Sequence, residues 1–150
     1  MLQRSIAQST EGGRPPHWKR GPHPWISILE DGLYAQTYPT TVHDEELLTF
    51  VAAVEHMIGS RFEPYAWIIA VDGLLHTNAA QRKHIADHVT RMQAHDARYC
   101  AGGGIVAATA FARGLVTAVF WLSPLPYPYR ILGSIAEAES YAIDQLRLRR

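Results

Sequence analysis

The residues that could bind a small charged group lie in two segments, Asp72-Gly73 with Thr77, and Thr109 with Arg113. Arg113 falls in the first turn of a predicted helix, where a cation opposes the helix dipole, so a bound anion or an acidic partner would account for it. Both segments follow predicted strands, and ligands of parallel α/β sheets usually bind at the carboxyl ends of the strands. Asp72, Gly73, Thr109 and Arg113 therefore form a candidate anion or ligand site. A simple contact of Arg113 with Asp72 or with solvent is the alternative.

Thr77 is a candidate phosphoacceptor, because it places a hydroxyl at the predicted start of a helix. Added negative charge is favourable there, since the helix dipole and free backbone N–H groups face it. The alternative is that Thr77 only caps the helix, which contributes about 1 kcal/mol.

Other reactive residue types do not form a motif that indicates catalysis or metal binding. His84, His88 and His95 share one helix face but lack the Glu of a zinc-peptidase motif, so we expect a solvated face. Cys100 has no companion in sequence, and we expect it to be inert. Gly102–Gly104 precedes a strand instead of following one, which favours a tight turn over a phosphate loop. We expect no catalytic residue, no metal site and no cofactor.

The segment Ala110–Leu122 is apolar on nearly all sides and leads into the proline-rich stretch Pro124–Tyr129. Apolarity around a whole helix indicates either deep burial or contact with a partner. A core helix is one interpretation, and an interface with another protein or a second copy of the chain is the other. The residues we expect in such an interface are Arg113, Phe120, Trp121, Tyr127 and Tyr129.

The composition is that of a single globular domain. The chain has 150 residues, 47% of them hydrophobic, with 14 basic and 14 acidic side chains and one cysteine. Zero formal net charge does not favour nucleic acid as a partner. The chain shows neither a signal peptide nor a membrane span, so a cytoplasmic location is expected. Residues 1–24, rich in Gly, Pro, Arg and His, are predicted to be a flexible tail, and residues 25–150 a domain.

The order of elements predicts an α/β fold. Asp31-Gly32 between two β-prone runs favours a hairpin with a type I′ turn. Tyr65–Val71 is a continuous apolar run, typical of a strand buried on both faces. Predicted helices and strands alternate along the chain after the hairpin. The full order is β-β-α-β-α-β-α-β-α, which predicts a mixed sheet with right-handed crossovers. The other segments are a helix from a Thr41 capping box to Gly59, a helix after Thr77-Asn78, a strand at 102–108, a helix at 110–122, a strand at 129–132 and a helix from Ser134.

This arrangement over residues 25–148 resembles a STAS domain of the anti-sigma-factor antagonist type. The resemblance rests on the opening hairpin, the central strand ending in Asp72-Gly73, and the loop Val71–Asn78 before the next helix. In that family the loop carries a Ser or Thr that a partner kinase phosphorylates, and Thr77 is the hydroxyl that corresponds. The family's more usual Asp-Ser-Ser-Gly-type loop is replaced here, with Asn78-Ala79-Ala80 in its place.

Two functions follow as expectations. The first is a non-enzymatic, STAS-like regulatory module of bacterial type that acts through protein contacts, with Thr77 as a switch position. The alternative is a small-ligand or anion-binding domain that uses the crevice at the strand ends.

Overall fold

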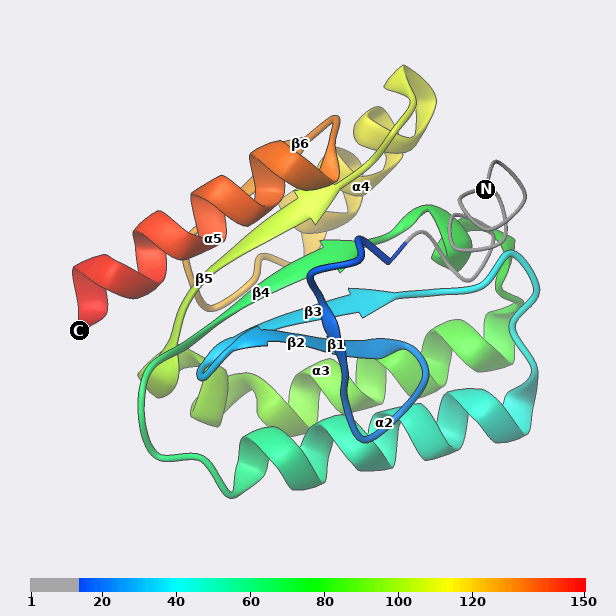
Figure 1. Ribbon diagram of the computed structural model, residues 1–150. Coiled ribbons are helices and arrows are strands. Elements are labelled where there is room, and N and C mark those ends of the chain that lie inside the picture. Colours follow the sequence, from blue (N-terminus) through cyan, green and yellow to red (C-terminus); the bar gives the residue numbers. More distant parts are fainter. Residues whose placement is uncertain (1–13) are drawn as a thin grey trace, which may run out of the picture.

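A computed structural model describes residues 14–150 as one mixed sheet with helices on both faces (Figure 1). The strands follow in spatial order β1 (Lys19–Arg20), β2 (Ile26–Glu30), β3 (Leu33–Thr37), β4 (Tyr65–Ala70), β5 (Cys100–Val106) and β6 (Tyr129–Leu132). The helices are α2 (Asp44–Gly59), α3 (Ala79–Tyr99), α4 (Ala110–Leu122) and α5 (Ile135–Arg149), with a 3₁₀ helix η1 (Asp72–His76). The expected α/β class and mixed sheet are confirmed.

Strand β4 lies in the middle of the sheet, parallel to β3 on one side and to β5 on the other. Its side chains alternate between the two faces, with Trp67 in the cluster beneath α2 and α3, and Ala66 and Ile68 in the cluster beneath α5. Both faces are covered, which explains why this segment carries no charged residue before Asp72.

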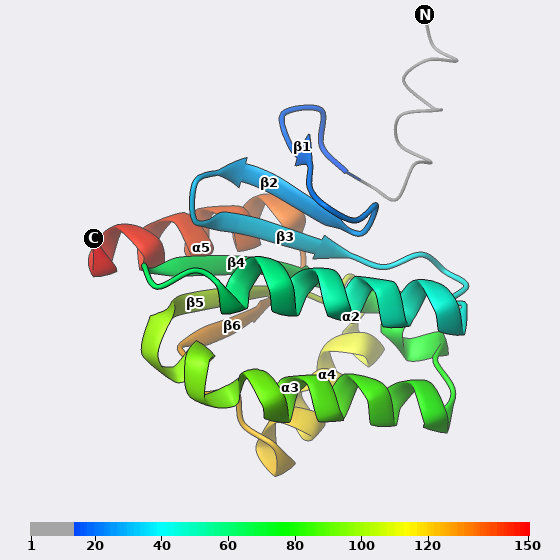
Figure 2. The ribbon, with the colours of Figure 1, turned by 90° about the horizontal axis from the view of Figure 1, so that it is seen from below.

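The two faces of the sheet differ in side-chain size. The face beneath α2 and α3 carries large rings, among them Trp25, Phe50 and Trp67. Beneath α5 the sheet carries the small residues Ala35, Ala66 and Ala101, and α5 contributes Ala138 and Ala142 to the same contact. Small side chains let α5 approach the strands closely, whereas α3 stays further from them (Figure 2).

The glycine run Gly102–Gly104 lies inside β5, so the expected tight turn is wrong. A Cβ on Gly104 would lie 2.5 Å from the carbonyl oxygen of Ala138 on α5, and a Cβ on Gly102 would lie 2.8 Å from the Gln145 side chain. On the other face, a Cβ on Gly103 would lie 2.9 Å from the ring of Tyr127. The glycines are needed because neighbours approach the strand backbone closely from both sides.

The predicted tail boundary at residue 24 is also wrong for the part that the structure describes. Strand β1 pairs with β2, Trp18 and His23 are buried, and the His17 ring lies 2.9 Å from Glu139 of α5. Trp18 covers the α5 face of the sheet where the helix does not reach. Residues 1–13, the remainder of the predicted tail, lie outside the described residues.

The opening hairpin of β2 and β3 forms as expected, but its turn is not type I′. Gly32 has φ +82°, and no non-glycine residue of the described chain has positive φ, so Asp31 does not adopt the second left-handed conformation. A register shift between Ile28 and Glu30 interrupts the ladder beside the turn. Such a bulge increases the local twist of the strands, which a type I′ turn would otherwise have to match.

Three of the helix caps position the elements around the strand ends. Thr109 accepts a hydrogen bond from the Ala112 N–H, and Ser134 accepts one from the Glu137 N–H. Asn78 and Gln81 form a reciprocal capping box at the start of α3. The Thr41 cap predicted for α2 is wrong: the helix begins one residue after His43, whose side chain makes no capping bond.

A prediction follows from the contact between Gly104 and α5. Gly104→Ala would place a methyl group against the Ala138 backbone, so we expect the free energy of unfolding to fall by about 1–3 kcal/mol. Urea denaturation measures this. Gly114→Ala is the matched control, because nothing lies within 4 Å of its added Cβ on α4. That control should gain about 0.5–1 kcal/mol. Equal stability of wild type and Gly104→Ala would contradict the close seating of α5.

Candidate functional site

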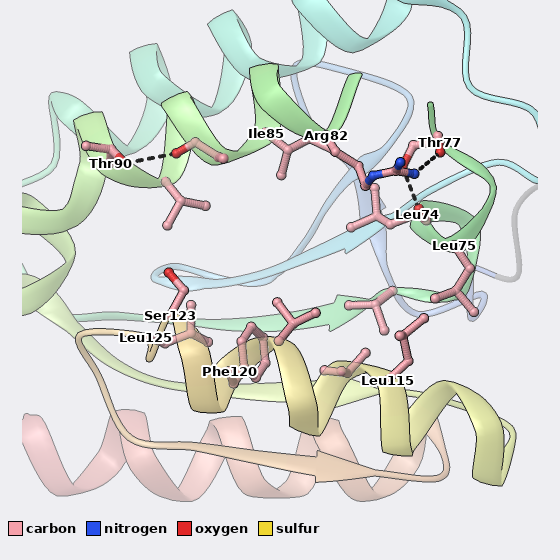
Figure 3. Close-up of a pocket in the computed structure, with 15 residues that line it drawn as sticks. Leu74, Leu75, Thr77, Arg82, Ile85, Thr90, Leu115, Phe120, Ser123 and Leu125 are labelled. Atoms are coloured by element: carbon pink, nitrogen blue, oxygen red, sulfur yellow. Dashed lines mark hydrogen bonds between the residues drawn. The ribbon is translucent and has the colours of Figure 1, made fainter. Parts of the chain in front are cut away.

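An apolar groove of about 570 Å³ lies between α3 and α4, at the carboxyl end of β4 (Figure 3). Val71, Leu74 and Leu75, from the end of β4 and from η1, form one end of it. The α3 wall carries Ile85, Ala86 and Val89, and the α4 wall carries Leu115, Val116, Val119 and Phe120. The side chains of the two helices point toward one another across the groove (Figure 3).

Helix α4 forms a wall because it is apolar on more sides than the sheet can cover. Ala112 and Val116 are buried against the strands, while Leu115 and Val119 face the groove and remain about half exposed, at 43% and 51%. Phe111, Trp121 and Leu122 are more exposed still. The helix is therefore neither wholly core nor wholly interface.

Most of the polar atoms at the groove rim are already occupied by backbone partners. The Thr77 hydroxyl donates to the Leu74 carbonyl at 2.6 Å, and the Thr90 hydroxyl donates to the Ala86 carbonyl at 3.0 Å. The Arg82 guanidinium donates to the Thr77 carbonyl (Figure 3). Among the residues that line the groove, Arg82 is the one with a positively charged side chain. The walls consequently present mainly aliphatic carbon to anything that enters.

A second cavity, of about 160 Å³, lies beside the groove and beneath α3. The two share side chains, among them Leu74, Ile85 and Phe120. The inner cavity differs from the groove in its polar lining. Those polar side chains are Gln36, Tyr38, His88, Asp96 and Tyr127.

The polar groups around the inner cavity favour their uncharged forms. Burial raises the pKa of the Tyr38 and Tyr127 hydroxyls and of the Asp96 carboxyl. The Tyr38 hydroxyl donates to the Gln36 side-chain oxygen at 2.6 Å, and the Tyr65 hydroxyl donates to Asp96. The cavity thus ends in hydrogen-bonding groups, and no Lys or Arg of the described residues lines it.

Contrary to expectation, the histidines of α3 do not form one solvated face. The His88 side chain is 13% exposed and lies between α2 and α3, with Nδ1 3.6 Å from a Glu55 carboxylate oxygen. Arg91 Nε donates to the same oxygen at 2.6 Å. His95 stacks on the Tyr65 ring. Sequence periodicity missed this because α2 covers part of the polar side of α3.

The four residues of the predicted anion site lie at the strand-end edge, but they do not line the groove. Asp72 accepts a hydrogen bond from the Ala108 N–H at 3.2 Å, and Arg113 donates to the Ala107 carbonyl at 3.4 Å. Within residues 14–150 Arg113 makes no ion pair, with Asp72 or with any other residue. Gly73 packs against the Pro39 carbonyl, and Thr109 caps α4. Anion binding here stays a prediction.

Thr77, the predicted phosphoacceptor, is 5% exposed and precedes the helix cap instead of forming it. Asn78 is the residue that caps α3. A kinase could reach the Thr77 hydroxyl only if η1 opened and released the bond to Leu74. Phosphorylation stays a prediction.

The five residues of the predicted interface do not share one surface. Trp121 is 83% exposed, whereas Phe120 packs on the Tyr129 ring with the ring centres 5.0 Å apart. Tyr127 lies over Gly103, against the cluster beneath α3. Leu74 and Leu75, which sequence analysis did not select, belong to the groove. The signal for them was an apolar pair directly after a strand that ends in Asp-Gly.

In residues 14–150 no three His, Cys, Asp or Glu side chains are grouped so that they could hold a metal ion. None of the helices within this range has the length and apolarity needed to cross a membrane. Comparison with known proteins finds no family model, no curated protein and no solved structure that matches the chain.

The buried position of His88 leads to a prediction about pH. Burial lowers the pKa of His88 below 6.5, so the unfolded chain binds a proton more readily than the folded chain does. The contribution of His88 to stability is complete above pH 6.5 and is lost as the pH falls below it. We expect His88→Gln to flatten the decrease in unfolding free energy between pH 7.5 and pH 5, measured by urea denaturation.

His84→Gln is the matched control, since His84 is an exposed residue on the same helix. It should keep the wild-type dependence on pH. The pKa of His23 is also lowered mainly by burial, so His23 should contribute a pH dependence of stability that remains in both variants. Identical pH dependences for His88→Gln and wild type would show that His88 is solvated.

Proposed function

We propose that this chain is a non-enzymatic binding domain that holds an apolar small molecule between α3 and α4. The observation that carries the proposal is the groove itself, whose walls are aliphatic and whose threonine hydroxyls are occupied by backbone carbonyls. Its volume, about 570 Å³, is in the usual range for small-molecule sites, which is about 300–1,000 Å³. Its place at a strand carboxyl end is also the usual one in α/β sheets.

The chemistry of the walls selects the ligand class. An alkyl chain gains about 0.8 kcal/mol for each methylene that leaves water, and aliphatic walls supply no competing polar partner. A chain of about eight to ten carbons would gain several kcal/mol in this way, which offsets part of the free-energy cost of immobilising the ligand. A strongly hydrated ligand would lose its water without compensation in this groove.

A variant that fills the groove tests this proposal. Ala86 lies on the α3 wall and is exposed to the groove, so Ala86→Phe would occupy ligand space without entering the core. We expect it to weaken binding of the neutral apolar dye N-phenyl-1-naphthylamine by about tenfold or more, a change of about 1.4 kcal/mol. Dye fluorescence, titrated and then displaced with 1-decanol, gives the affinities.

Ala94→Phe is the matched control, because Ala94 is an exposed residue of the same helix outside the groove. It should bind the dye as wild type does. If the two variants bound the dye equally, or if wild type did not bind it, the groove would not be a ligand site.

The exposed apolar residues of α4 favour a second candidate function, a STAS-like regulatory module that works through protein contacts. Phe111, Trp121 and Leu122 are 76%, 83% and 89% exposed, on one helix. Contiguous exposed apolar surface is a feature of interaction sites. The resemblance to anti-sigma-factor antagonists supports a partner protein or a second copy of the chain, with Thr77 as a switch once η1 opens.

The oligomeric state tests this second function. We expect wild type to self-associate through α4, and Trp121→Glu to be a monomer, because a carboxylate at the contact would be buried without a partner. Multi-angle light scattering over a concentration series measures the mass. Phe62→Glu, an exposed ring outside α4, should behave as wild type. Wild type that stays a monomer at every concentration would exclude self-association through α4.

A further inference from the structure

We propose that the ligand is an amphiphile with an uncharged hydrogen-bonding head group, and that this head group enters the inner cavity while the alkyl chain occupies the groove. The inference rests on the proposed function. It adds the orientation of the ligand and the chemistry of its head.

The inner cavity adjoins the groove and has a different lining. Its 160 Å³ correspond to the volume of about five water molecules in the liquid, which suits a small head group. The shared residues Leu74, Ile85 and Phe120 are apolar, whereas Gln36 and Tyr127 are found in the inner cavity alone. The two neighbouring spaces therefore differ in the polar groups that they offer to a ligand.

Tyr127 is held in place by the backbone around it. Its ring occupies the space above Gly103, where a Cβ would come within 2.9 Å of Cε2. The segment on either side of it reads Pro126-Tyr127-Pro128, and proline restricts the backbone of each residue before it. The side chain is thus positioned before any ligand binds, which lowers the entropy cost of binding.

The Tyr127 hydroxyl is available to a ligand. Tyr127 lines the inner cavity, and burial raises the pKa of its hydroxyl, so the hydroxyl stays protonated and can donate a hydrogen bond. Within residues 14–150 it has no hydrogen-bond partner, in contrast to the hydroxyls of Tyr38 and Tyr65. A cavity-lining hydroxyl that makes no bond within the described protein can bond to a ligand head group without giving up a protein partner.

An anionic head group is disfavoured because no Lys or Arg side chain in the described part of the chain lines the inner cavity. Burial also disfavours charge there, since it raises the pKa of Asp96 and lowers that of His88. Glu55 on α2 and Arg91 on α3 flank His88 and pair with each other. The cation nearest to a ligand is Arg82, which lines the groove but not the inner cavity. A carboxylate buried here would lack a counter-charge.

Two variants of the proline-rich segment test the proposal. Tyr127→Phe removes one hydroxyl and keeps the ring over Gly103. Tyr129→Phe makes the same change in a ring that packs on Phe120 outside the inner cavity. Binding of 1-decanol and of decanoate is measured for both variants and wild type, by displacement of N-phenyl-1-naphthylamine.

We expect wild type to bind 1-decanol more tightly than decanoate. Tyr127→Phe should weaken 1-decanol binding about three- to tenfold, as loss of one neutral hydrogen bond does, and should leave the dye affinity unchanged. Tyr129→Phe should bind both compounds as wild type does.

Equal 1-decanol affinities for Tyr127→Phe and wild type would overturn the inference while leaving the groove as a ligand site. Tighter binding of decanoate, lost in Arg82→Gln, would also overturn it, because the head would then lie at the rim. If wild type bound neither dye nor alcohol, the proposed function itself would fail, and this inference with it.

Discussion

The structure depends on an asymmetry of side-chain size between the two faces of its sheet. On one face Gly102, Gly104 and several alanines let α5 settle against the strands, close enough that a methyl group on Gly104 would collide with the helix backbone. On the other face, rings that include Trp67 and Phe50 fill the space between the sheet and helices α2 and α3. Helix α3 therefore lies further from the strands than α5 does, and the groove between α3 and α4 is on this face.

The groove follows from this asymmetry together with the composition of α4. Three helices cover the aromatic face, but α4 contacts mainly β6 and the end of β5, and α3 leans on α2. The buried Gln81 strengthens that second contact, because its amide donates to the Val42 carbonyl and to the Asp44 carboxylate. With α3 held toward α2 and α4 toward the edge strand, the aliphatic sides of α3 and α4 face each other across a space that neither fills.

Local signals in the sequence were reliable where the physical cause was local. The β4 run, the helix over 110–122 and the helix that begins after Ser134 were all predicted, because apolar run length and helix-start signals act within a few residues. The residues of the candidate anion site lie at the edge of the sheet where they were expected, since strand direction follows from the order of elements. The groove was not predicted, because strand β5 and one short loop separate its two helical walls in the chain, and only their packing brings them together.

The sequence by itself determined which segments are helices and strands, that β4 is covered on both sides, and that α4 has more apolar surface than one contact can bury. Only the tertiary structure decided that neighbours approach Gly102–Gly104 closely from both sides, that Lys19–Arg20 joins the sheet, and that Tyr127 turns inward while Trp121 does not. The reason is that periodicity and propensity depend on neighbours in the chain. The fit of a ring over a glycine, or of a helix on alanines, depends instead on residues that are distant in sequence.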